Sequence, residues 1–416
     1  MLVLQFLIIL VSAASLIHSF LSLLNRKVNS AIIFSPVFFI LYSLHTYLDV
    51  IYGMPNYETK FYNLKLAYEN LETNFIYMLV VFLLNTILLF SQVKLRKYNL
   101  NDSDLFNKPS KLIRLTLYFL ILVPFLLLFL SPVPSVYFNY GEIRGYLGTP
   151  VYVFHNLIIN FTLLSALIIT YLRFIEGREI TSVKSTLLLI ALVLDVYLNN
   201  KRTVMFIFLA YFLMDYYYAK ASSILNKIKL FCGVVIFLSS YMFYANNIKY
   251  DDGRVIDEYL QYRIEFGRDD ILKYSIYKTI VLGDDILDYP GQTFLGSIAI
   301  YVPRSIFEKK PYPYAQYLTN SLVWNDKGPA LNGWSLTTSI VDEFVSNFKL
   351  WGIPMLIFFY ISALFFANKF LINLKSLLLL CVFILWHFVH VVPFAPLLYF
   401  FMLLAFRDFL RLFKFR

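Results

Sequence analysis

Charged residues are scarce in this chain of 416 residues. Asp, Glu, Lys and Arg together make up 15% of it, and hydrophobic residues make up 59%. A soluble globular domain is about one quarter charged and about half apolar. So few polar residues cannot cover a soluble globule, which excludes the soluble class and makes lipid the main solvent of the chain.

Cysteine is nearly absent. Cys232 and Cys381 both lie within apolar runs, which argues against a disulfide framework and against a zinc site built on cysteine. The net charge is +10, yet the basic residues occupy short loops between apolar segments. A nucleic-acid-binding surface gathers its basic residues on one polar face. We therefore expect no nucleic-acid partner.

Long apolar runs are what the chain does contain, and internal repeats and Gly/Ser linkers are missing. Residues 1–24 lack a basic leader segment and are long enough to cross a bilayer, so they are interpreted as the first transmembrane helix and not as a signal peptide. Eleven candidate spans follow from the apolar runs: 1–24, 32–50, 74–93, 112–131, 151–173, 184–199, 203–219, 228–246, 350–367, 375–392 and 394–409. The predicted fold is a single all-α polytopic membrane domain, residues 1–416.

The loops between these spans differ in positive charge. Twenty Lys and Arg residues fall in one alternate set of loops and five in the other, with the long polar segment 246–349 left out. Cytoplasmic loops retain positive charge, and long loops cross the membrane whatever their charge. This predicts an N-terminus outside, a cytoplasmic C-terminus and one large extracytoplasmic loop at 246–349. Within that loop, the apolar spacing over 255–282 predicts an amphipathic helix on the surface.

Several basic residues fall on the predicted outer side. Because guanidinium groups bind phosphate oxygens in pairs, we interpret them as candidate ligands of a lipid pyrophosphate: Arg144, Arg202, Arg263, Arg268, Arg304 and Lys310. The alternative is that they are solvated charges balanced by the many acids of the same loop. Arg202 stands apart, because it lies between two short apolar segments with no acid beside it, a costly and usually functional setting.

Two acids directly precede a predicted membrane helix. Asp342 and Glu343 are candidates for a general base, although a helix N-terminus also favours acids through its dipole alone. The pairs of adjacent Asp residues elsewhere in the loop lack the spacing of a metal loop, so we expect no metal and no cofactor. His387 and His390 lie one helical turn apart and fit packed core residues as well as ligands.

Three short motifs in the second half of the chain resemble the O-antigen polymerase (Wzy) family of oligosaccharide repeat unit polymerases. The residues that carry the resemblance are Asn200-Lys201-Arg202-Thr203, then Val302-Pro303-Arg304 with Lys310-Pro311, and finally Gly333, Thr337, Glu343, Asn347, Phe348 and Gly352. The predicted topology, with one large late outer loop, is also similar. Lys349 departs from the family pattern, which has glycine after Asn-Phe.

The resemblance implies a glycosyltransferase of the GT-C-like type that needs no metal. Its substrate would be an undecaprenyl-pyrophosphate-linked oligosaccharide, polymerised into O-antigen or capsular polysaccharide at the outer face of a bacterial plasma membrane. It also implies a flippase and a chain-length regulator of the same pathway as partners. Arginines would hold the pyrophosphate, and Glu343 or Asp342 would accept the proton of the acceptor hydroxyl.

Three alternatives remain open, and one of them is a non-catalytic membrane partner of a glycan assembly system. An O-antigen ligase has a similar frame but passes the finished glycan to a lipid core. A lipid-linked oligosaccharide flippase or other transporter is a different class of protein, and transporters are typically built from two related halves with ionisable residues deep in their helices. The two halves of this chain are dissimilar and its polar mass lies in one loop, which favours the enzyme.

Overall fold

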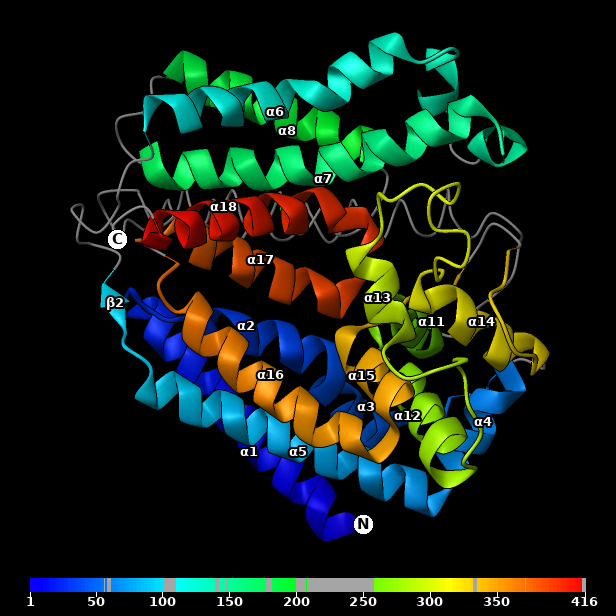
Figure 1. The fold of residues 1–416 in the computed structure, drawn as a ribbon. Helices are drawn as coiled ribbons and strands as arrows, with labels where there is room; N and C mark the ends of the chain where they lie inside the picture. Colours follow the sequence, from blue (N-terminus) through cyan, green and yellow to red (C-terminus); the bar gives the residue numbers. More distant parts are fainter. Residues whose placement is uncertain are drawn as a thin grey trace. The chain divides into compact units, whose positions relative to one another are not determined.

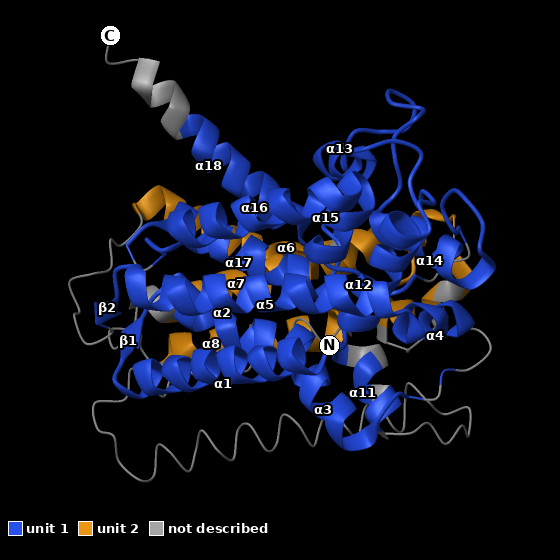
Figure 2. Ribbon diagram, turned by 90° about the horizontal axis from the view of Figure 1, so that it is seen from below, with its two compact units in different colours: residues 1–105, 256–416 blue, residues 106–255 orange. Residues whose placement is uncertain are grey.

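The computed structural model describes residues 1–55, 57, 61–99, 110–138, 142–146, 148–176, 182–199, 207, 258–331, 335–370 and 372–413. Contacts divide the chain into two compact units. Unit 1 comprises residues 1–105 and 256–416, and unit 2 comprises residues 106–255 (Figure 2).

The first half of unit 1 is a group of helices with one short β-ladder (Figure 1). The helices are α1 (Leu2–Leu24), α2 (Ser30–Phe38), a π-helical turn η1 (Phe39–Ser43), α3 (Leu44–Tyr52), α4 (Tyr62–Glu69) and α5 (Leu71–Lys94). β1 (Lys27–Val28) pairs antiparallel with β2 (Tyr98–Asn99), so that the chain leaving α1 lies beside the chain leaving α5.

The second half of unit 1 begins with short helices and ends with longer apolar ones. The elements are α11 (Glu258–Phe266), α12 (Asp269–Ile276), η8 (Tyr277–Val281), α13 (Gln292–Ile298), α14 (Tyr314–Trp324), α15 (Ile340–Phe348), η9 (Lys349–Trp351), α16 (Gly352–Ala367), α17 (Leu374–Phe388), η10 (Val392–Phe394) and α18 (Ala395–Phe413).

The described residues of unit 2 form three long helices, in which α7 packs against both α6 and α8. They are α6 (Lys111–Leu130), α7 (Pro150–Glu176) and α8 (Ser182–Asn199), with two 3-10 turns, η4 (Pro134–Phe138) and η5 (Glu142–Tyr146), between α6 and α7.

Helix α1 shows why this sequence suits lipid. Its buried face consists of Ile8 and four small polar residues, Ser12, Ser15, Ser19 and Ser22, while most of its large apolar residues are exposed. Gln92 of α5 donates to Ser15 Oγ at 2.9 Å and to Ser19 Oγ at 3.0 Å. Small side chains let membrane helices approach closely and hydrogen-bond to each other. The polar residues therefore hold the helices together, and the apolar ones face outward.

The core of unit 1 joins both halves of the chain. Phe34 and Phe38 of α2 lie in one buried cluster with Val81 of α5, Leu272 of α12 and Tyr360 of α16. Ring centroids of Phe34 and Tyr360 are 6.0 Å apart in an edge-to-face arrangement. Helices α12 and α15 thus pack on the N-terminal helices and position the segments that follow.

Six helical segments among the described residues are long and apolar enough to cross a membrane: Leu2–Leu24, Ser30–Tyr52, Leu71–Lys94, Lys111–Leu130, Pro150–Arg173 and Ile340–Ala367. Two shorter apolar helices, Leu374–Phe388 and Ala395–Arg407, follow. The structure is that of an all-α membrane protein, as predicted. The count of about eleven spans is not supported by the described residues, and 203–219 and 228–246 lie almost entirely outside them.

The predicted surface helix over 255–282 is wrong. The segment instead forms α11, α12 and η8, with a break at Gly267 and Arg268, and all eight residues of α12 are buried. A Cβ at Gly267 would lie 2.5 Å from Arg263 O, so only glycine permits this tight break. Arg263 of α11 and Asp269 and Asp270 of α12 can be buried because they pair with each other, and Arg263 also pairs with Asp49 of α3.

Candidate functional site

A cavity of about 180 Å³ lies beside α13. The segment 300–313, the first turn of α15 and the connection between α17 and α18 form its other walls. Three of the predicted site residues line it, namely Arg304, Lys310 and Glu343, and His390 is a fourth ionisable residue in its wall. The structure therefore brings two cations and one carboxylate to a single cavity.

Glu343 is held in this wall by neighbours from three elements. Trp386 of α17 donates its indole N–H to Glu343 Oε2 at 3.0 Å, and the Thr293 hydroxyl of α13 also hydrogen-bonds to the carboxylate. Asn347, one turn further along α15, donates to Thr293 Oγ1 at 2.8 Å and to Glu343 O at 2.8 Å. The carboxylate is thus fixed in one orientation toward the cavity.

Asp342 has a different environment from its neighbour. It accepts the Ser339 backbone N–H at 3.0 Å, and its carboxylate also accepts the Ser339 hydroxyl. These contacts form a capping box at the N-terminus of α15. Asp342 is fully buried and does not line the cavity. Its position fits the alternative that it stabilises the N-terminus of the helix. Of the two acids, only Glu343 can meet a substrate in the cavity.

Arg304 and Lys310 brace the same loop. Lys310 Nζ donates to Val302 O at 2.8 Å and to Ile300 O at 3.1 Å, and Arg304 Nη1 donates to Lys310 O at 2.7 Å. The guanidinium carbon of Arg304 lies 3.8 Å from the ring centroid of Tyr312. Among the described residues, the other guanidinium nitrogens of Arg304 have no hydrogen-bond partner. They remain available to an anion.

The electrostatics of this loop affect Lys310. Partial burial, and then the neighbouring Arg304 cation, lower the pKa of Lys310 below its ordinary value of 10.5. Both causes disfavour a second positive charge at this point. An anion in the cavity would remove the repulsion between the two cations, so the arrangement favours binding a negatively charged group.

Sequence reasoning missed part of the wall. The sequence leaves His390 open between a packed core residue and a ligand, and only its spacing from His387 points to it. His387 is the residue that packs in the core, where its ring bonds to Tyr360 and to Phe383 O. Tyr314 also lines the cavity, and no sequence pattern indicated it. Its hydroxyl is bound to Ser346 at 2.6 Å.

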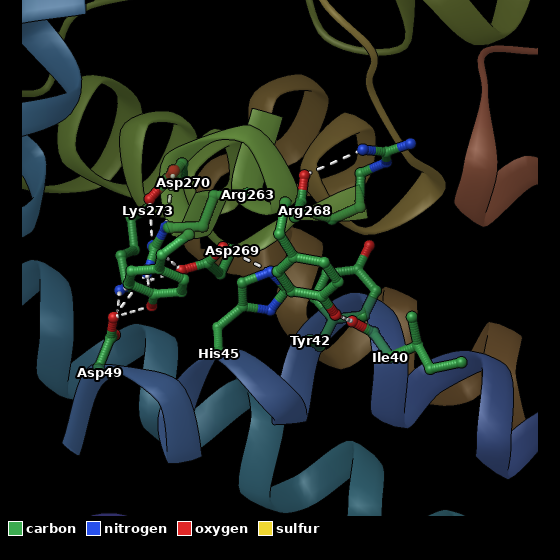
Figure 3. A network of polar contacts seen from close by, with 12 residues as sticks. Ile40, Tyr42, His45, Asp49, Arg263, Arg268, Asp269, Asp270 and Lys273 are labelled. Atoms are coloured by element: carbon green, nitrogen blue, oxygen red, sulfur yellow. Dashed lines mark hydrogen bonds and ion pairs between the residues drawn. The ribbon is translucent and has the colours of Figure 1, made fainter. Parts of the chain in front are cut away.

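Arg263 lies in a buried ionic cluster and not in the cavity. Its guanidinium pairs with Asp49 of α3 at 2.6 Å and with both Asp269 and Asp270 of α12 (Figure 3). Lys273 Nζ lies 3.3 Å from Asp269 Oδ2. Three carboxylates occupy this guanidinium, so Arg263 supports the fold of α11 and α12 rather than contacting a pyrophosphate.

The cluster shifts the ionisation of its members. Burial by itself would raise the pKa of the Asp270 carboxyl, but the charge and hydrogen bond of Arg263, with Lys273 and the Tyr57 hydroxyl, together outweigh burial and lower it. The pKa of Asp269 is raised, because burial there outweighs the attraction of Arg263. Asp270 is therefore the more firmly ionised of the two acids.

Arg268 is also buried and faces away from this cluster (Figure 3). Its Nη1 donates to Gly267 O at 2.9 Å and its Nη2 to Phe388 O at 2.8 Å, at the last residue of α17. A cation at a helix C-terminus stabilises the exposed carbonyl groups there. Arg268 thus links α12 to the end of α17, outside the cavity wall.

The structure gives no side-chain position for the two remaining predicted ligands, Arg202 and Arg144. Arg202 lies outside the described residues, and so does Gly333 of the third motif. Arg144 falls within η5 of unit 2, where its backbone alone is described. Within the described ranges, no group of three His, Cys, Asp or Glu side chains could hold a metal ion.

Gly352 of the third motif has a clear structural reason. A Cβ at this position would lie 2.3 Å from Phe344 O, so α16 can start against the end of α15 only with glycine there.

Comparison of the whole chain with family models, with curated proteins and with solved structures gives no match.

Proposed function

We propose that this membrane protein is a glycosyltransferase that polymerises oligosaccharide repeat units carried on undecaprenyl pyrophosphate. The product would be an O-antigen or a capsular polysaccharide, and the reaction would take place at the outer face of the plasma membrane. The single observation that supports this proposal best is the cavity in which Arg304, Lys310 and Glu343 meet.

The proposed reaction exchanges a glycosyl phosphate bond for a glycosidic bond. The bond between the anomeric carbon of the growing chain and its pyrophosphate oxygen breaks, and a bond from that carbon to the acceptor hydroxyl oxygen forms. Glu343 takes the proton of the hydroxyl, and the lipid pyrophosphate leaves with the electron pair of the broken bond. General base catalysis of this kind contributes about 10²- to 10⁴-fold to a rate.

Arg304 and Lys310 supply the charge that this leaving group needs. Negative charge develops on the pyrophosphate as the bond breaks, and donors already fixed in place stabilise it without reorganisation. Tyr312 and the loop carbonyls hold both cations in place before any substrate arrives. The planar donor edge of Arg304 suits two phosphate oxygens at once.

The size of the cavity restricts what enters it. Its volume of about 180 Å³ is below the roughly 300–1,000 Å³ of pockets that enclose whole small-molecule ligands. The reacting pyrophosphate and anomeric centre fit this space, whereas the sugar chains of donor and acceptor must extend beyond it.

The test uses a strain that lacks this gene and carries single-residue variants in its place, with surface glycan separated on a gel. Arg304→Ala and Glu343→Gln are expected to abolish the ladder of polymer lengths while a single repeat unit is retained. Asp342→Asn and Lys309→Ala are matched controls, one beside each site residue, and both should keep the ladder at equal protein level.

Other outcomes would point to other functions. Polymer that accumulates on the carrier lipid in the deletion strain would indicate an O-antigen ligase. A strain without any externalised repeat unit would indicate a flippase. A full ladder from Arg304→Ala at normal expression would contradict the assignment of the cavity.

A further inference from the structure

Helix α8 of unit 2 carries an acid on its buried face. Its buried positions follow helical spacing, Leu188, Leu192, Asp195 and Asn199, while Leu187, Ile190 and Val193 on other faces are exposed. Asp195 is 0% exposed. Burying an acid without a counter-charge is costly, so the position calls for a compensating partner.

Polar oxygens of α7 face this acid. Ser165 lies beside the Asp195 carboxylate but directs its hydroxyl to Ile121 O at 3.5 Å. One turn away, the amide of Asn199 donates to Thr162 Oγ1 at 2.8 Å and to Ile159 O at 2.7 Å. Ser165 and Thr162 are both fully buried. A polar seam thus runs between α7 and α8.

Nothing in the described part of unit 2 compensates the acid. Among the described residues, neither oxygen of Asp195 has a hydrogen bond of standard geometry, although the Ser165 hydroxyl interacts with the carboxylate. Lys184 of the same helix lies over the Tyr118 ring, with Nζ 4.8 Å from its centroid. Burial of an unpaired carboxylate carries a large desolvation penalty.

Two buried acids of unit 1, by contrast, have a counter-ion. There the buried acids Asp269 and Asp270 are paired with Arg263, so the chain provides its own counter-ion. No such counter-ion is found for Asp195 among the described residues of unit 2.

We propose that Asp195, with the oxygens of Ser165, Thr162 and Asn199, binds one monovalent cation in the interior of unit 2, either a proton or a sodium ion. A single carboxylate compensates a single charge, whereas divalent ions are bound by several carboxylates. The hydroxyl and amide oxygens of the seam would complete the shell of a sodium ion, and a proton needs only the carboxylate. This site is independent of the cavity in unit 1.

The test is carbodiimide labelling of the full-length protein in nanodiscs, with dicyclohexylcarbodiimide and peptide mass spectrometry. A protonated carboxyl adds across the C=N bond of the reagent, its oxygen to carbon and its proton to nitrogen, and the acyl group then migrates to nitrogen. In sodium-free choline buffer at mildly acidic pH, we expect label on Asp195 and none on the ion-paired Asp270. Asp195→Asn should lose the label from that peptide.

Adding sodium chloride then distinguishes the two ions. Protection by sodium, and not by choline chloride of equal concentration, identifies a sodium site. Labelling that is unchanged by sodium identifies a proton site. If Asp195 is unlabelled at every pH in the folded protein but labelled after unfolding in dodecyl sulfate, a group of the protein itself occupies the carboxyl and the proposal is overturned.

Discussion

Lys349 shows how a single backbone conformation can be detected from sequence. The resemblance predicts glycine at this position, and the structure gives Lys349 a φ of +52° and a ψ of −132°. Only glycine adopts such angles without steric cost, and a strained residue costs on the order of 1–3 kcal/mol. The family pattern thus identified a strained position, although nothing in the side chains revealed it.

Replacing this lysine should stabilise the protein. Lys349→Gly removes the strain, at the loss of an ion pair to Asp285 in which both side chains are about half exposed and which therefore contributes little. We expect a free energy of unfolding higher by about 1 kcal/mol, measured by thermal denaturation in detergent. Lys349→Ala is the control, because it loses the ion pair and keeps the strain. Equal melting temperatures for the two variants would argue against strain at this residue.

Lys310 should give the reaction an alkaline limit. Because its pKa is lowered from 10.5, it loses its proton at a lower pH than a free lysine, and the pyrophosphate loses one of its two cations. Activity should therefore fall as the pH rises toward 10.5 from below. Lys310→Arg should extend activity to higher pH, since arginine stays charged. Polymerisation by protein in liposomes, followed across this range, checks the shift, and identical profiles for both proteins would count against a role for Lys310.

At the scale of elements, burial of α12 depends on charge pairing. Arg263 compensates Asp49, Asp269 and Asp270 in one cluster. Arg263→Met removes the cation and leaves the acids buried, a change that typically costs about 3–5 kcal/mol. We expect a lower melting temperature, with partial recovery in a variant that also carries Asp269→Asn and Asp270→Asn.

Protonation of Asp270 should weaken this cluster, as the substitution does. The folded-state pKa of Asp270 lies below 3.8, so its contribution to stability is complete above pH 3.8 and is lost as the pH falls through the folded value. The Arg263→Met protein should show less of this acid-dependent loss. If Arg263→Met melts like the native protein, the cluster does not hold α11 and α12 together.

At the scale of the whole molecule, the distribution of positive charge predicts which side each loop faces. Ile306 is 78% exposed beside the cavity and should lie outside, whereas Asn25 should lie in the cytoplasm. Single cysteines at these positions, introduced after replacement of Cys232 and Cys381, can be labelled in intact cells with a maleimide that does not cross membranes. We expect label at position 306 and none at 25 until the cells are opened; the reverse pattern would invert the predicted orientation.

Composition and hydropathy alone determined the fold class and the position of most helices, because a chain in lipid must satisfy its backbone hydrogen bonds within each helix. The chemical type of Arg304, Lys310 and Glu343, their place in the predicted outer loop and the family resemblance made them candidates for the site. Only the tertiary structure separated Glu343 from Asp342, since adjacent helical residues point in different directions and one of them caps the helix. It likewise assigned Arg263 and Arg268 to buried contacts, because the partners of a charge come from distant helices that local sequence cannot bring together.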